Sequence, residues 1–143
     1  MMKMIHSYWA YLVLALLIFT VVNAVINSKK EYKDKDLRVA LFTLIVSHIQ
    51  LLIGLGWYFM SPAYKHLKEN GMAVTMKDAH ARLLTVEHPI MMILAIVFIT
   101  IGFSKHKKLT TSAAKYKTIL VWYGLALLFI LSRIPWSQWI GGQ

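Results

Sequence analysis

The stretch that decides the fold class is residues 37–60, which read LRVALFTLIVSHIQLLIGLGWYFM. Apart from Arg38 near its start, this stretch holds no charged residue. An α-helix rises about 1.5 Å per residue, so a helix of this length crosses a bilayer hydrocarbon core roughly 30 Å thick. Aromatic residues at 57–59 and Pro62 just beyond are typical of a helix end at the membrane interface.

Three more apolar runs of similar length lie at about 5–26, 83–103 and 118–134. The chain of 143 residues is 58% hydrophobic and 15% charged, and its mean hydropathy is +0.56, which disfavours a water-soluble domain. We therefore expect an all-α, polytopic membrane protein. Its single domain, 1–143, would hold four transmembrane helices in an up-down bundle.

The residue composition excludes several kinds of site. The chain has no cysteine, which excludes disulfides, thiolate-bound zinc, iron–sulfur clusters and covalently attached haem. The net charge of +10 is carried by basic residues beside membrane-length runs, so anionic lipid explains it better than nucleic acid does. The expected partners are the lipid bilayer and other membrane protein subunits, with no nucleic acid.

The first apolar run has two possible interpretations. Val22-Asn23-Ala24 loosely resembles a signal-peptide cleavage site. However, the run is longer than a typical signal core, and the positive charges follow it instead of preceding it. We therefore expect a retained helix.

The distribution of Lys and Arg predicts the orientation in the membrane. The first and third connections carry ten: Lys29, Lys30, Lys33, Lys35, Arg38, Lys105, Lys107, Lys108, Lys115 and Lys117. The opposite side carries six: Lys3, Lys65, Lys68, Lys77, Arg82 and Arg133. By the positive-inside rule both termini should lie outside, in the periplasm if this is a multi-pass protein of a bacterial inner membrane.

The second connection, residues 63–82, is polar. Asn70-Gly71 predicts a turn, and Thr75 is the expected N-cap of a helix that starts near Met76.

Histidine is uncommon inside a membrane span, because an unpaired polar group in hydrocarbon costs several kcal/mol. Three histidines fall within the expected spans: His6, His48 and His88. The other three lie in connections or near helix ends, where solvation is the expected state: His66, His80 and His106.

His48 lies near the middle of its run. It shares a helical stripe with Leu44, Leu51 and Leu55, so its ring should face other helices. An interhelical hydrogen bond and ligation of haem or a metal are both open for it.

The third run starts with a carboxylate beside a histidine, Glu87-His88. A carboxylate at this depth needs a partner, and Arg82, Arg133, Lys3 or a protonated histidine could supply it. In one interpretation, ion pairs of Glu87 hold the outer ends of the helices together. In the other, His88 is a ligand and the carboxylate of Glu87 orients it.

The depths of these histidines limit which of them can meet. Counted from the inner charges at about 1.5 Å per residue, His48 lies roughly 15 Å deep, His88 roughly 25 Å and His6 roughly 35 Å. Helix tilt of about 20° could close a 10 Å gap but not a 20 Å one. Either His48 with His88 or His6 with His88 could therefore share one haem.

Five short motifs follow one another along the chain: His6-Ser7, HIQL at 48–51, YFMSP at 58–62, Arg82 with Glu87-His88, and IPW at 134–136. Over nearly the whole chain this succession resembles a family of short four-helix membrane proteins commonly labelled cytochrome b.

The resemblance implies haem b held by histidines and electron transfer in a respiratory setting. His48 and His88 would then be the axial ligands of the haem iron, with His6 in reserve. Glu87 and Arg82 would orient a ligand or contact the haem propionates.

Two other functions stay open. The chain could be a cofactor-free accessory or structural subunit of a larger membrane complex, perhaps a respiratory one, or it could form a proton or metal path along the histidines and Glu87. An enzyme acting on an organic substrate is poorly supported, because no nucleophile is paired with a base in a recognisable motif.

Overall fold

The computed structural model describes residues 2–136, and in this part of the chain every regular element is a helix. Four helices are long and apolar enough to cross a membrane, which confirms the expected all-α fold with four membrane-length helices. They are α1 (Met2–Ile26), α2 (Asp34–Met60), a composite of α4 (Ala79–Arg82), η1 (Leu83–Glu87) and α5 (His88–Lys107), and α6 (Ser112–Arg133).

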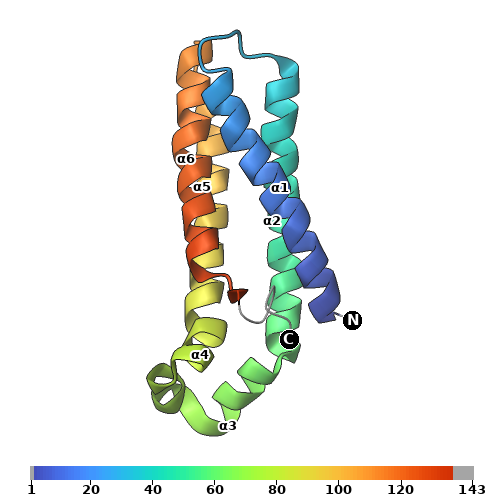
Figure 1. Cartoon of the computed structure of the whole chain (residues 1–143), viewed down its shortest axis with the longest axis vertical. Coiled ribbons are helices and arrows are strands. Elements are labelled where there is room, and N and C mark those ends of the chain that lie inside the picture. The colour runs from blue at the N-terminus through green and yellow to red at the C-terminus, as the bar shows by residue number, and fades with distance from the viewer. Residues whose placement is uncertain (1, 137–143) are drawn as a thin grey trace.

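The long helices pack as two pairs, α1 with α2 and α5 with α6, and the pairs meet through α1 against α6 and α2 against α5. Figure 1 shows the connections 27–33 and 108–111 together at one end of the bundle. The helix α3 (Pro62–Lys77) lies at the other end, beyond α2 and α4. The end with the two short connections is called the inner end below and the α3 end the outer end, after the orientation that the basic residues predict.

The long helices start earlier than their apolar runs do, and the first turns of α2 and α6 show why. The helix α2 begins at Asp34 rather than at residue 37, because acidic residues favour the positive end of the helix dipole in its first turn. The helix α6 begins at Ser112 rather than at residue 118, because the Thr111 side chain caps it by accepting from Ala114 N at 3.2 Å. Hydropathy therefore predicts the membrane part of each of these helices, whereas the residues of the first turn determine where the helix begins.

The second connection differs from the expected turn. It is the helix α3, broken at Gly71, whose φ of +84° is a conformation that glycine adopts readily. The expectation that Thr75 is an N-cap is wrong, since its hydroxyl donates to Gly71 O at 3.0 Å. The N-cap is Asp78 instead, which accepts from His80 N at 3.0 Å.

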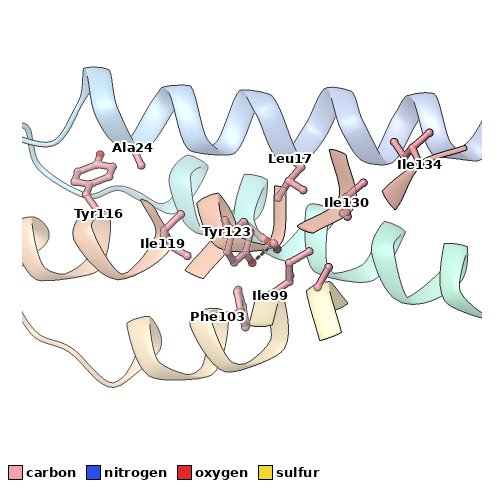
Figure 2. Close-up of a cluster of buried hydrophobic side chains, with 12 residues drawn as sticks. Leu17, Ala24, Ile99, Phe103, Tyr116, Ile119, Tyr123, Ile130 and Ile134 are labelled. Atoms are coloured by element: carbon pink, nitrogen blue, oxygen red, sulfur yellow. Dashed lines mark hydrogen bonds between the residues drawn. The ribbon is translucent and has the colours of Figure 1, made fainter. Parts of the chain in front are cut away.

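The buried core lies between the two helix pairs. Figure 2 shows Leu17 of α1, Ile99 of α5 and Tyr123 of α6 converging there, and all three are fully buried. The Tyr123 hydroxyl donates to Ala40 O of α2 at 2.8 Å, so the buried polar group is satisfied across the helix interface.

At the inner end of the bundle the sequence expectation for His106 is wrong. The ring is fully buried instead of solvated, because Tyr32 from the first connection folds over it, with the hydroxyl 2.7 Å from Nε2. Burial and, to a lesser degree, the charge of Asp36 raise the pKa of the Tyr32 hydroxyl, which keeps it protonated and able to donate. Asp36 is buried beside them and accepts from Asn23 and Tyr116.

We expect Tyr32→Phe to lower the free energy of unfolding by about 1–3 kcal/mol, because it leaves a buried imidazole nitrogen without its donor. Thermal or denaturant unfolding in detergent micelles measures the change. Tyr8→Phe is the matched control, since Tyr8 is 66% exposed. Equal stability of the two variants would show that the Tyr32 contact contributes nothing.

Candidate functional site

A cavity of about 300 Å³ lies in the outer half of the bundle, between α1, α2, α5 and α6. Most of its lining is apolar, as is usual for pockets that bind ligands in proteins. Its few polar side chains include His6 and Lys3 from α1, Gln50 from α2 and His88 from α5.

The rings of His6 and His88 lie next to each other in the wall of this cavity. Their centroids are 6.3 Å apart and their planes are nearly perpendicular, at 84°. The structure thus brings together one of the two histidine pairs that the sequence left open.

Each ring of this pair has a nitrogen without a hydrogen-bond partner in the described residues. His88 Nδ1 lies 2.8 Å from Arg133 O, and because a carbonyl only accepts, Nδ1 carries the proton and Nε2 keeps its lone pair. His6 Nδ1 is buried without a hydrogen-bond partner within residues 2–136, with the Gln50 side chain beside its ring, and His88 Nε2 makes no hydrogen bond in the same part of the chain. A buried polar atom without a partner is costly, so these nitrogens indicate a site for a ligand.

The end of α6 supplies the carbonyl that holds His88. Ile134 precedes Pro135 and is extended, with φ −68° and ψ 134°, because a residue before proline disfavours the helical conformation. The helix therefore stops at Arg133, whose carbonyl has no helical donor and accepts from His88 instead. Such a bond to Nδ1 is the usual way in which a metal-ligating histidine is oriented.

His88 itself follows a local change of helix type. The π-helix η1 ends at Glu87, directly before His88, and single turns of this kind often lie at functional sites. Pro89 has no N–H to give to the carbonyl of Thr85, one turn earlier. The Tyr58 hydroxyl of α2 donates to that carbonyl instead, at 2.9 Å, and so ties α2 to the start of α5.

We expect Tyr58→Phe to destabilise the protein by about 1–2 kcal/mol, because the Thr85 carbonyl loses its donor. In a Pro89→Ala background the main chain can donate to this carbonyl, so the cost of Tyr58→Phe should shrink. A double-mutant cycle on unfolding free energies measures the coupling. Strict additivity of the two substitutions would contradict this account of Pro89.

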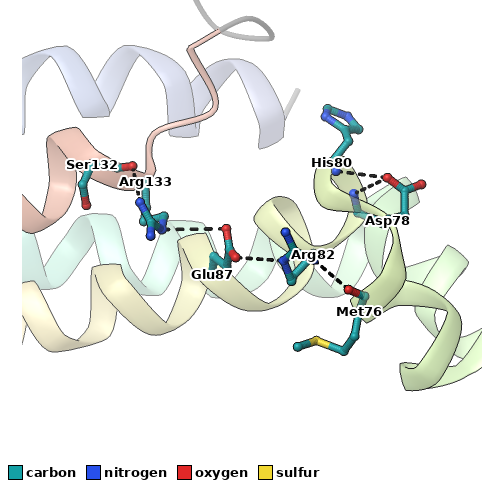
Figure 3. Close-up of polar contacts among 8 residues, drawn as sticks. Met76, Asp78, His80, Arg82, Glu87, Ser132 and Arg133 are labelled. Atoms are coloured by element: carbon teal, nitrogen blue, oxygen red, sulfur yellow. Dashed lines mark hydrogen bonds and ion pairs between the residues drawn. The ribbon is translucent and has the colours of Figure 1, made fainter.

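Glu87 forms ion pairs at the outer end, away from any ring nitrogen. Its carboxylate lies 2.9 Å from Arg82 Nε and 3.7 Å from Arg133 Nε (Figure 3). Arg82 also donates to Met76 O at 2.7 Å. Glu87 is therefore paired with two of the partners that the sequence suggested, Arg82 and Arg133. The main-chain carbonyl of Arg133 also accepts from His88, which links the ion pairs to the histidine.

His48 is placed differently from the sequence expectation. Its side chain is exposed on the outside of the bundle, because the buried face of α2 runs through Ala40, Thr43 and Ser47, a step of about 100° away. Its two nitrogens lie near Leu44 O, at 2.8 Å, and Thr100 Oγ1, at 3.3 Å. The ring therefore contacts a neighbouring helix, as expected, but from an exposed position, and its contact with Thr100 of α5 matches the open alternative of an interhelical hydrogen bond.

The histidine depths expected from the sequence favoured no pair, because the basic residues from which they were counted do not lie at the same level of the bundle. Lys29 lies in the connection beyond α1, whereas Lys105 lies within α5. Counted from the inner helix ends, His6 is 20 residues from Ile26 and His88 is 19 residues from Lys107. The two histidines are therefore at nearly equal depth.

Other polar atoms of the cavity were not singled out from the sequence as site residues. Ser47 Oγ and Gln50 Oε1 are buried without a hydrogen-bond partner in the described part of the chain, and both residues line the cavity. A glutamine inside an apolar run was the signal that could have found Gln50. No group of three or more His, Asp or Glu side chains suited to a metal ion occurs in residues 2–136.

Comparison of the chain with family models, with curated proteins and with solved structures gave no match.

Proposed function

We propose that the chain is a small integral-membrane, b-type cytochrome-like protein that binds haem b between His6 and His88 and takes part in electron transfer in a respiratory setting. The observation that carries the proposal is the neighbouring pair of imidazoles, 6.3 Å apart, at the wall of a largely apolar cavity. Each ring has one nitrogen without a hydrogen-bond partner in the described residues, and an iron held by the two rings would supply that partner.

The separation of the ring centroids is one at which both histidines could hold the same metal ion. With nitrogen–metal bonds of about 2 Å and each ring centre about 1 Å behind its nitrogen, the centroids lie about 6 Å apart. The pair in this chain has that spacing. The cavity volume lies at the lower end of the usual range for ligand pockets, about 300–1,000 Å³.

The chain's own residues have distinct tasks in this proposal. His88 presents Nε2 because the Arg133 carbonyl holds the proton on Nδ1. Lys3 lines the cavity and offers an ammonium group to a carboxylate of the ligand. The apolar walls exclude water from the histidine pair. Haem, when bound, supplies one-electron transfer, and its potential depends on the axial ligands and on this burial.

The proposal includes an orientation in the membrane. Ten of the sixteen basic residues lie at the inner end, which favours an up-down bundle in a bacterial plasma membrane with both termini outside. Because the chain has no cysteine, single cysteines introduced at Lys30 and Lys68 can be labelled from either side. We expect a membrane-impermeant thiol reagent added outside to label position 68 only; labelling at position 30 alone would reverse the orientation.

The experiment that tests the cofactor is the visible spectrum of the protein purified from cells with an ample haem supply. We expect a Soret band and a pyridine haemochrome of the b type, close to one haem per chain. A colourless preparation under these conditions would contradict the proposal and leave a cofactor-free subunit of a larger complex as the remaining function.

A further inference from the structure

Two reciprocal hydrogen bonds set the register between α1 and α2 beside the histidine pair. Trp9 Nε1 of α1 donates to Val46 O at 2.9 Å, and Gln50 Nε2 of α2 donates to the backbone oxygen of His6 at 2.9 Å. The two donors come from opposite helices and lie about one helical turn apart. Together they prevent α1 from sliding along α2, and they fix the depth of His6.

The next turn of α2 determines where the His6 ring can lie. Val46, Gln50 and Gly54 follow one another at intervals of four, so they lie on one face of the helix. A Cβ at Gly54 would lie 3.1 Å from His6 Cε1 and 3.5 Å from Nδ1. The ring therefore rests directly against the α2 backbone, and only a residue without a side chain leaves it there without displacement.

We propose that Gln50 and Gly54 are positioning residues for His6: Gln50 sets its depth through the main chain, and Gly54 sets the place of its ring opposite His88. The helix α2 supplies no ligand in this arrangement, yet it determines the geometry of the imidazole pair. The inference rests on the proposed function, because it assigns these residues to the same haem site.

The first test compares Gly54→Ala with Gly124→Ala in the haem-loaded protein. A Cβ at Gly124 meets no atom within 4 Å, so this variant carries the same chemical change without the contact. We expect Gly54→Ala to push the His6 ring aside, which weakens one axial bond. The reduced protein should then bind carbon monoxide in a several-fold larger fraction than the wild type, and the low-spin resonance of the oxidised protein should shift. Gly124→Ala should match the wild type in both measurements.

Gln50→Leu tests the depth of His6 separately. It removes the donor to the His6 carbonyl at nearly equal side-chain volume, and we expect the same rise in carbon monoxide binding at an almost unchanged amount of bound haem. Gln50→Leu and Gly54→Ala proteins with wild-type resonance and wild-type carbon monoxide binding would overturn the inference.

A second measurement tests the register without any haem. Gln50 binds the main chain of residue 6, so this bond persists in a His6→Cys/His88→Cys protein, which has no other thiol. We expect a short bis-maleimide to join these two cysteines readily and to do so several-fold more slowly when Gln50→Leu is added. Equal rates would overturn the role of Gln50, whereas a colourless wild type with a slowed cross-link would contradict only the proposed haem.

Discussion

His6→Ala and His88→Ala are each expected to remove most of the bound haem, whereas His48→Ala is expected to retain it. The first two substitutions delete the two neighbouring imidazoles that line one cavity, each with a ring nitrogen that has no hydrogen-bond partner in the described residues. The third deletes a ring that is exposed and whose nitrogens lie near Leu44 O and Thr100. Because loss of an outer-shell partner alone changes metal affinity by about 10–100-fold, loss of a ligand should exceed about 10-fold.

Haem content per chain, measured by pyridine haemochrome after purification in matched detergent, gives the result directly. His48→Ala is the matched control, since it is the same substitution in an equally apolar span. Haem loss in His48→Ala with full retention in His6→Ala would reverse the ligand assignment.

Gly102→Ala is expected to be the most destabilising of the glycine substitutions in the long helices. A Cβ at Gly102 of α5 would overlap Trp122 Cβ of α6 and lie 3.1 Å from Trp122 Cγ, so these helices could not keep their present approach. Overpacking of this kind costs about 1–3 kcal/mol, and contact between small residues is a main source of helix association in membranes.

Unfolding in mixed micelles with increasing dodecyl sulfate measures this cost. Gly124→Ala on α6 is the control, because its Cβ meets open space and alanine favours a helix. Equal midpoints for the two variants would show that the close approach of α5 and α6 is not required.

The fold class was predictable from hydropathy, since a membrane span needs a long apolar helix and the chain has four. The helix ends were less predictable because they depend on capping. Thr111 and Asp78 begin helices at positions that an apolar run does not mark. The helix α3 was missed because its residues are mostly polar, and only its break at Gly71 was foreseen as a turn.

The site was predictable in its residue types but not in its pairing. His6, His48 and His88 stood out because histidine is rare in hydrocarbon. Their expected depths could not show which two of them meet, because the depths were counted from charged residues and should have been counted from the helix ends. Burial of His106 was not predictable either, since it depends on Tyr32, which is 74 residues away in the sequence. Contacts of this range are set by how helices pack, which hydropathy does not encode.

The central claim is that the imidazoles of His6 and His88 bind one iron between them. Electron paramagnetic resonance of the oxidised protein, with pulsed detection of nitrogen from isotope-labelled histidine, tests it most directly. We predict a low-spin ferric signal coupled to two histidine nitrogens, and in the small amount of haem that the His6→Ala or His88→Ala protein retains, a high-spin signal coupled to one. A high-spin signal with one histidine nitrogen, or no haem signal in protein made with ample haem, would contradict the claim.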